Sequence, residues 1–195
     1  GTVMMDGGGM SGNSAVYGGG VGIERTIKDP VFNMYGGEIT NNKAASSGGF
    51  GGGVYVCDGT FKMSGGEITG NTATNTGGGV YAARKGSKIT MSGNARIADN
   101  EVTDSDGKGG GVYVGTAVTF TMSGGSITEN TTSSGNGGGV YVNGTFNMSG
   151  GTIENNTATI YSGEAYGDGG GVYVNSTSKF NMSNASITGN SAGKN

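Results

Sequence analysis

The sequence predicts an all-β fold: a right-handed parallel β-helix, or solenoid, of about six to seven triangular coils with three short strands per coil. A unit that reads Gly-Gly-Gly-Val-Tyr-Val, then Phe-x-Met-Ser-Gly-Gly-x-Ile-x-x-Asn, recurs along the whole chain. Glycine accounts for 46 of 195 residues and keeps fixed places in the unit, as tight corners require. Between these corners, apolar and polar residues alternate as in strands with one buried face. The methionine of the unit falls at Met5, Met34, Met63, Met91, Met122, Met148 and Met182.

One unit, which begins at Gly51, predicts the elements of one coil. Glycine at this density and an alternation of period two both oppose helices. The segments between corners are also too short for crossover helices, so each strand is expected to pair with its equivalent one coil above and below. In chain order the unit gives a strand at 54–56, a corner at 57–59, a strand at 60–64, a corner at 65–66, a strand at 67–69 and a turn at 70–73.

Equivalent residues should stack in columns along the axis of the solenoid. Five inward columns are apolar, occupied by valine, isoleucine, phenylalanine and methionine at most positions. One extra residue before Arg96 and Ile97 predicts a β-bulge at that point. Asparagine can bond along the axis and can also satisfy turn backbone groups. It forms an unbroken column at Asn13, Asn42, Asn71, Asn100, Asn130, Asn156 and Asn190.

Length and composition indicate a single domain and exclude some classes of binding partner. The length fits one β-helix domain, 1–195, and the chain opens within a repeat, as a segment of a longer repeat protein would. The net charge of −3 and the absence of a basic stripe exclude the surface that nucleic acid requires. No apolar run approaches the ~20 residues of a membrane span. The only cysteine, Cys57, excludes an internal disulfide, and no cofactor or metal is predicted.

Two kinds of position are candidates for binding. A tyrosine stripe is expected on the outside of the first strand, since these residues alternate with inward valines; aromatic rings can stack on sugars or on a partner, although tyrosine also simply favours strands. Two long loops are the other candidates, because loops on rigid scaffolds often bind. Asp104 to Gly107 resembles the start of a calcium loop but lacks the closing acidic residue. The candidates are Tyr55, Tyr81, Tyr113, Tyr141 and Tyr173 in the stripe, and Asp104, Asp106, Tyr161, Glu164, Tyr166 and Asp168 in the loops.

Catalysis is not predicted, and no catalytic residue is assigned. The chain contains no histidine, which removes the commonest general base and every Ser-His or Cys-His arrangement. The best carboxylate pair, Glu38 and Glu67, should project outward from adjacent coils at ~5 Å, a separation that suits a retaining glycosidase. Arg96 is expected above them and favours a solvated charge cluster instead. A carbohydrate-active enzyme, a polysaccharide hydrolase or lyase, is therefore kept as the alternative function.

The second strand displays a further outward array of threonine, serine, asparagine and lysine. A flat threonine face on a β-solenoid would suggest ice binding. Lysines such as Lys62 and Lys88 and asparagines such as Asn147 interrupt the regularity, so ice binding is the weaker alternative.

The repeats resemble those of adhesin-type β-helix proteins on microbial cell surfaces. They are similar to the polymorphic outer-membrane proteins: Gly-Gly-Gly-Val at 51, 77, 109, 137 and 169 resembles a Gly-Gly-Ala-Ile-like motif, and Ile68 to Ala73 resembles a Phe-x-x-Asn motif with isoleucine for phenylalanine. The resemblance implies an extracellular or cell-surface location and adhesion to a host or microbial glycan or protein. Open solenoid ends template further stacking, so end-to-end assembly into fibres is a variant of this hypothesis.

Overall fold

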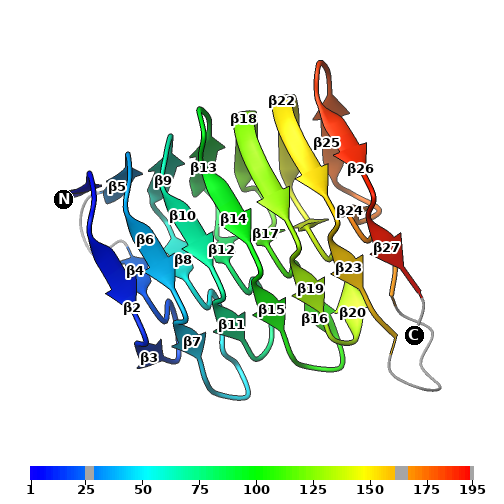
Figure 1. The fold of residues 1–195 in the computed structure, drawn as a ribbon, viewed down its shortest axis with the longest axis horizontal. Helices are drawn as coiled ribbons and strands as arrows, with labels where there is room; N and C mark the ends of the chain where they lie inside the picture. Colours follow the sequence, from blue (N-terminus) through cyan, green and yellow to red (C-terminus); the bar gives the residue numbers. More distant parts are fainter. Residues whose placement is uncertain (25–28, 161–166, 194–195) are drawn as a thin grey trace.

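The computed structural model describes residues 1–24, 29–160 and 167–193, and this part of the chain is a parallel β-solenoid of about six turns. Successive coils lie side by side from the N-terminal to the C-terminal end (Figure 1). Every strand pairing is parallel, and no helix occurs among the described residues. The predicted fold class is confirmed.

The first strand of each coil forms a six-stranded sheet. Valine at its first and third positions is fully buried in the middle coils, and the tyrosine between them faces outward. The strands are β4 (Val21–Glu24), β8 (Val54–Cys57), β12 (Val80–Ala83), β17 (Val112–Val114), β21 (Val140–Val142) and β24 (Val172–Val174).

The second and third strands share one twelve-stranded sheet, because two coils run through the Ser-Gly-Gly corner as single long strands, β18 (Thr119–Thr128) and β22 (Thr145–Glu154). The two strand positions are therefore less separate than a triangular coil predicts. The second-strand members are β1 (Thr2–Met5), β5 (Val31–Met34), β9 (Thr60–Met63), β13 (Lys88–Met91) and β25 (Lys179–Met182). The third-strand members are β2 (Gly9–Ser11), β6 (Glu38–Thr40), β10 (Glu67–Thr69), β14 (Arg96–Ala98) and β26 (Ser186–Thr188).

Each coil has a fourth short strand where the sequence predicts a turn. This strand follows the asparagine of each repeat unit and buries a small side chain, such as Ala44, Ala73 or Val102, in a second apolar cluster. These strands form a seven-stranded sheet, and two loops add one more pair. They are β3 (Ser14–Ala15), β7 (Lys43–Ala44), β11 (Thr72–Ala73), β15 (Glu101–Val102), β19 (Thr131–Thr132), β23 (Thr157–Ala158) and β27 (Ser191–Ala192), with β16 (Gly107–Lys108) and β20 (Gly135–Asn136) as the loop pair.

The bulge predicted at Arg96 and Ile97 is wrong. Arg96 pairs with Glu67 and Ile97 pairs with Ile68, in unbroken register. The extra residue lies in the preceding corner, where Gly93 takes a positive φ of 60° and Ala95 is buried. The register shift falls instead between β18 and β22, after Met122. A corner absorbs an insertion at lower cost than a ladder, because its backbone groups are not all committed to two neighbours.

The predicted asparagine column is a continuous buried hydrogen-bonded ladder. Asn71 Oδ1 accepts from the backbone N–H of Asn42 (2.9 Å) and from its Nδ2 (3.0 Å), and the same pair of bonds links Asn71 to Asn100. Asn71 Nδ2 also donates to the carbonyl of Ile39 one coil back (2.9 Å). Each internal amide therefore bonds to the third strand and the turn of the coil before it and to the turn of the coil after it.

Replacing Asn100 by alanine should lower the free energy of unfolding by about 3 kcal/mol or more. The change leaves the backbone N–H of Asn71 without its acceptor and the carbonyl of Ile68 without the amide of Asn100, and it removes one of the acceptors of Asn71 Nδ2, all inside the solenoid. Asn147→Ala, at a partly exposed outward position bonded to Asn181, is the matched control and should change stability by roughly 0.5 kcal/mol or less. Urea unfolding followed by circular dichroism measures both; equal losses would contradict the role of the ladder.

Candidate functional site

The five predicted tyrosines form a single column on the outer face of the first sheet. Tyr55, Tyr81, Tyr113 and Tyr141 are paired in register between adjacent strands, and Tyr173 follows them. Their rings stack with centroid separations of 4.9 to 5.5 Å, and the planes of Tyr55 and Tyr81 differ by only 2°. The strand spacing of ~4.8 Å sets this separation, since side chains at one register position repeat at that distance.

The column is less exposed than the sequence predicts. Tyr141 is buried, with 7% of its surface accessible, and the other four tyrosines are half-buried. Each internal ring covers the face of the next, so the column presents ring edges and hydroxyls rather than free faces. Stacking of a sugar on a ring face, the interaction first considered for this stripe, is therefore blocked within the column.

Tyr17 and Phe50 extend the aromatic column, and the repeat pattern did not reveal them. The register position next to Tyr55 in the first coil is Gly22, and the ring of Tyr17 lies over Tyr55 instead, at 5.2 Å. Phe50 lies against both Tyr17 (5.8 Å) and Tyr81 (4.9 Å). The signal in the sequence was the aromatic residue just before the triple glycine in these two coils.

Burial and close packing change the ionisation of the tyrosines. Loss of solvent, assisted by the neighbouring Tyr113, raises the pKa of Tyr81 to about 12. Loss of solvent and the neighbouring Tyr173 and Tyr113 raise the pKa of Tyr141 to about 12. The pKa of Tyr55 is also raised, first by burial and then by Cys57. The hydroxyls of Tyr55, Tyr81 and Tyr141 are therefore neutral at physiological pH.

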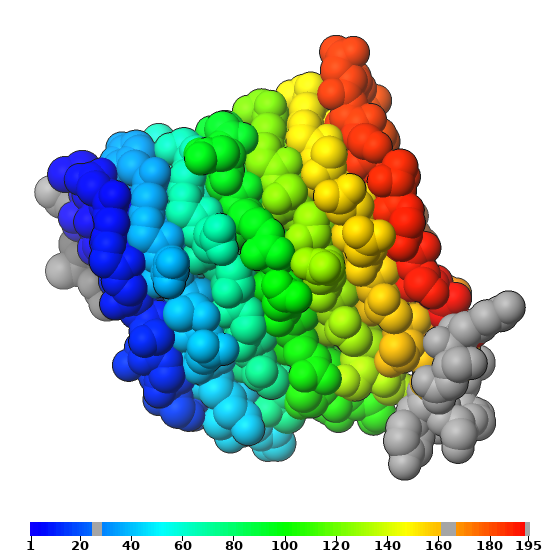
Figure 2. All heavy atoms as spheres, in the orientation of Figure 1, coloured from blue at the N-terminus to red at the C-terminus, as the bar shows by residue number. Residues whose placement is uncertain are grey.

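The carboxylate pair considered for catalysis lies on an open surface. Glu38 and Glu67 are adjacent in register and both exposed, as expected. Their strands β6 and β10 cross the near face in Figure 1, and the same face in Figure 2 shows no cleft. Arg96 Nη1 lies 3.6 Å from Glu67 Oε2, so the predicted charge cluster is present. Asp99 and Glu129 complete it around the other terminal nitrogen of Arg96, at 3.3 and 3.2 Å.

The two long loops have different partners. Asp104 accepts from Asn75 Nδ2 (3.3 Å) and from the backbone N–H of Ser105 (2.8 Å), and Asp106 pairs with Lys108 (2.7 Å). Asp168 is exposed, and its backbone N–H donates to Asn136 Oδ1. Tyr161, Glu164 and Tyr166 lie outside the described residues. Within the described ranges, no three His, Cys, Asp or Glu side chains gather as metal ligands would.

The threonine-rich outward face is chemically mixed. Lys62 lies beside Thr90 in register, and Thr121 lies beside Asn147, which bonds to Asn181 at 2.8 Å. An ice-binding face requires a regular array of one side chain, and these columns interrupt it in most coils.

No protein-family model matches the chain, and no curated protein or solved structure matches it. No helix long and apolar enough to cross a membrane occurs in residues 1–24, 29–160 and 167–193. The function must therefore be argued from the geometry of the solenoid.

The tyrosine column predicts a loss of stability between pH 10 and 12. In the unfolded chain tyrosine ionises near pH 10, whereas Tyr81 and Tyr141 stay neutral in the fold until about pH 12. Only the unfolded state gains ionisation free energy in that window, so the stability that these groups contribute is complete below pH 10 and falls as the pH rises to 12.

Unfolding free energies at pH 9, 10, 11 and 12 measure this effect. The double variant Tyr81→Phe, Tyr141→Phe keeps the stacked rings without the two hydroxyls, so it should lose clearly less stability across the window than wild type. The interpretation fails if the two proteins lose the same amount.

Proposed function

We propose that this chain is a rigid, non-enzymatic module of a secreted or surface-anchored microbial protein, which presents its sides and loops to a glycan or protein on a host or microbial surface. The observation that carries the proposal is the continuity of the solenoid: inward columns and the asparagine ladder hold every coil in register with the next. Such a stack resists local opening, because a coil opens only by breaking ladders on both sides. The resemblance of the repeats to surface adhesins supports an extracellular location.

The surface chemistry favours binding over catalysis. Glu38 and Glu67 are solvated on a flat strand face, and Glu67 is held by Arg96. A glycosidase needs one carboxyl group with a raised pKa and an enclosed site that distorts the sugar ring. The polysaccharide hydrolase or lyase alternative would have to use this open pair.

The edges of the tyrosine column are the repeated binding surface in this proposal. Because the rings stack along the axis, their hydroxyls form a row of hydrogen-bonding groups, one per coil. Asn143 Nδ2 lies 3.5 Å from the hydroxyl of Tyr113, so amides flank the line. A linear polymer with hydroxyl groups matches such a line better than a compact ligand does.

Removing two hydroxyls of the tyrosine column should weaken retention on glycan-coated surfaces. Tyr113→Phe with Tyr173→Phe keeps the rings and deletes the hydroxyls; at about 1 kcal/mol per hydrogen bond, affinity should fall by roughly fivefold per site. Tyr35→Phe, exposed and outside the column, is the matched control. A glycan array read with all three proteins measures the change.

The same assay separates binding from turnover. Glu38→Gln with Glu67→Gln should leave binding unchanged, and no sugar should be released by any of the proteins. Released sugar that disappears in the glutamate variants would favour the enzyme alternative instead.

Self-association end to end is the second part of the proposal. The end coils expose side chains whose columns are buried elsewhere, with Val3 54% accessible at one end and Met182 45% accessible at the other. The two ends of the ladder are complementary among the described residues: Asn13 Oδ1 receives no bond from a preceding coil, and the N–H of Asn190 donates to no following one. A second copy stacked head to tail would bring these two groups together.

Assembly of this chain should therefore depend on concentration and on its end surfaces. Val174→Lys with Met182→Lys places charge on the C-terminal coil and should abolish assembly seen by sedimentation velocity. Thr121→Lys with Ser149→Lys adds the same charge on the side of the solenoid and should leave assembly intact. A wild-type protein that stays monomeric at high concentration would contradict this part of the proposal.

A further inference from the structure

The corner between the first and second strands varies in length from coil to coil. After β8 it contains only residues 58–59, whereas after β12 it contains residues 84–87 and after β4 it ends at Asp29 and Pro30. The short corner lies beside the longer corner at 84–87 and beside Asp29 of the coil before it, and a notch lies between them. The repeat pattern did not reveal this notch, because it arises from the different corner lengths of neighbouring coils.

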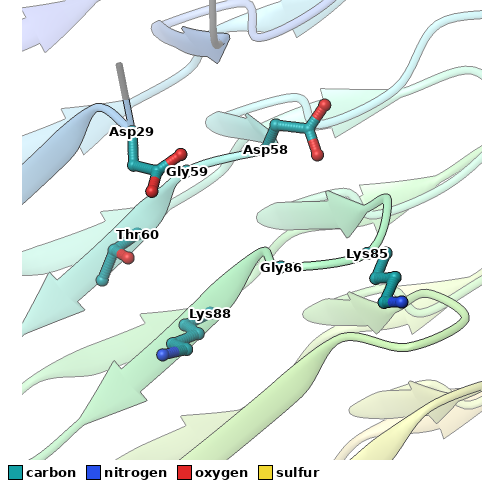
Figure 3. A pocket seen from close by; sticks show the side chains of 7 residues that line it. All are labelled: Asp29, Asp58, Gly59, Thr60, Lys85, Gly86 and Lys88. Atoms are coloured by element: carbon teal, nitrogen blue, oxygen red, sulfur yellow. The ribbon is translucent and has the colours of Figure 1, made fainter.

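This notch is a small polar hollow of about 190 Å³. Its side chains come from three successive coils: Asp29, then Asp58 and Thr60, then Lys85 and Lys88 (Figure 3). The two carboxylates lie on one side and the two lysines on the other, with Gly59 and Gly86 as backbone wall. Since sites for drug-sized ligands usually measure 300–1,000 Å³, this volume suits one small polar unit, such as a single sugar ring.

The notch is built by buried hydrogen bonds. Ser87 is buried, and its hydroxyl accepts from the N–H of Asp58 (2.9 Å) while it donates to the carbonyl of Ala83 (2.6 Å). The N–H of Lys88 donates to the carbonyl of Gly59 (3.0 Å), which fixes the second side of the short corner. Asp58 is held in the left-handed region, with φ of 57°. These bonds fix the backbone of both corners before any ligand arrives.

The charges in the notch are only partly balanced. Asp58, 22% accessible, lies 3.9 Å from Arg84, but its oxygens accept no side-chain hydrogen bond from the described residues. The ammonium groups of Lys85 and Lys88 are exposed, and neither pairs with a carboxylate in the part of the chain that the structure describes. By contrast, Lys108 is paired with Asp106.

The second short corner of the solenoid shows the opposite arrangement. It contains residues 143–144, between longer corners at 115–118 and 175–178. Asn143 donates to Thr116 Oγ1 (3.1 Å) and accepts from Asn175 Nδ2 (2.8 Å). The side-chain amide of this corner is therefore hydrogen-bonded to the corners on both sides. In the first notch, the ammonium groups of Lys85 and Lys88 and the hydroxyl of Thr60 make no hydrogen bond to another described side chain, and Asp58 has only the distant Arg84 as a partner.

We propose that this notch binds one anionic sugar unit of a glycan, with a carboxylate, sulfate or phosphate on the ring. Lys85 and Lys88 bind the anion through charge-assisted hydrogen bonds, and Asp58 and Thr60 bond to the ring hydroxyls. The inference rests on the proposed function, because it names the ligand class of a glycan-binding module.

The mixture of charges selects against other ligands. A bare anion would be repelled by Asp58, and a bare cation by the two lysines. A neutral sugar would leave both ammonium groups without a partner. Only a ligand that carries an anion and several hydroxyls uses both sides of the notch.

Amide chemical shifts of ¹⁵N-labelled protein test the proposal with four probes: glucuronate, glucose 6-phosphate, glucose and inorganic phosphate. The three sugars share one ring and differ at a single carbon. Both anionic sugars should bind at least tenfold more tightly than glucose or inorganic phosphate, with shifts centred on Gly59, Thr60, Gly86 and Lys88. The two anionic sugars distinguish a carboxylate source from a phosphate source.

Three variants make the result specific. Lys85→Gln with Lys88→Gln should reduce affinity for the anionic sugars at least tenfold, whereas Lys62→Gln with Lys179→Gln, on the neighbouring outward face, should change it less than twofold. Asp58→Asn, tolerated at positive φ, should strengthen binding of inorganic phosphate and weaken selection for the sugar ring. Unchanged affinity in the Lys85 and Lys88 variant overturns the proposal, as does equal binding of glucose.

The outcomes also separate this inference from the proposed function. Shifts along the tyrosine column in place of the notch would overturn the notch and leave a glycan-binding module in place. Absence of shifts with all four probes overturns the notch alone, because retention on arrays of long glycans depends on the tyrosine hydroxyls and is measured separately. Loss of that retention, with binding in the notch preserved, would overturn the role of the column.

Discussion

The asparagine ladder is the interaction on which the rest of the solenoid depends. Its amides are fully buried in the central coils, at Asn71, Asn100 and Asn130, and each is bonded to the coil before and the coil after. A buried amide in this position is stabilising only if all its groups are satisfied, and only one register satisfies them. Apolar columns tolerate small slips, whereas this ladder does not, so it sets the alignment that the apolar columns then fill.

The ladder explains why glycine is needed opposite it. A Cβ on Gly53 would lie 3.1 Å from Asn71 Nδ2, and one on Gly52 would lie 2.4 Å from the carbonyl of Gly78 in the next coil. The backbone of the triple glycine therefore packs directly against the side-chain amide of the asparagine and against the triple glycine of the next coil. With this side of each coil fixed so tightly, variation in length falls mainly in the loops before the triple glycine and in the corner after the first strand, with one extra residue in the corner before Arg96.

The repeat pattern of the sequence predicts the features that every coil shares, but it does not predict those that depend on contacts between neighbouring coils. The parallel solenoid and the asparagine column follow from period and alternation, and both are present. The fourth strand was missed because two residues, such as Thr72 and Ala73, are too few to show an alternation. The bulge was misplaced because spacing counts an extra residue without saying whether corner or ladder absorbs it. The exposure of Tyr141 was overestimated because burial in a stack depends on the neighbours of the ring, which the alternation within one strand does not describe.

Repetition also limits the chemistry that the sides of the solenoid can offer. A side chain that is repeated in every coil lies about 5 Å from an identical side chain in the next coil, and the two tend to interact with each other. Tyrosine stacks on tyrosine, and Asn181 donates a hydrogen bond to Asn147. Charge columns behave alike, since Arg96 is held by Glu67, Asp99 and Glu129. Groups left available for a ligand are therefore concentrated where the repeat is broken, at a short corner flanked by longer ones. Lys85 lies in the longer corner and has no counterpart in the coil before it, and Lys88 lies beside Thr60 rather than beside a carboxylate, so neither charge is paired within the described residues.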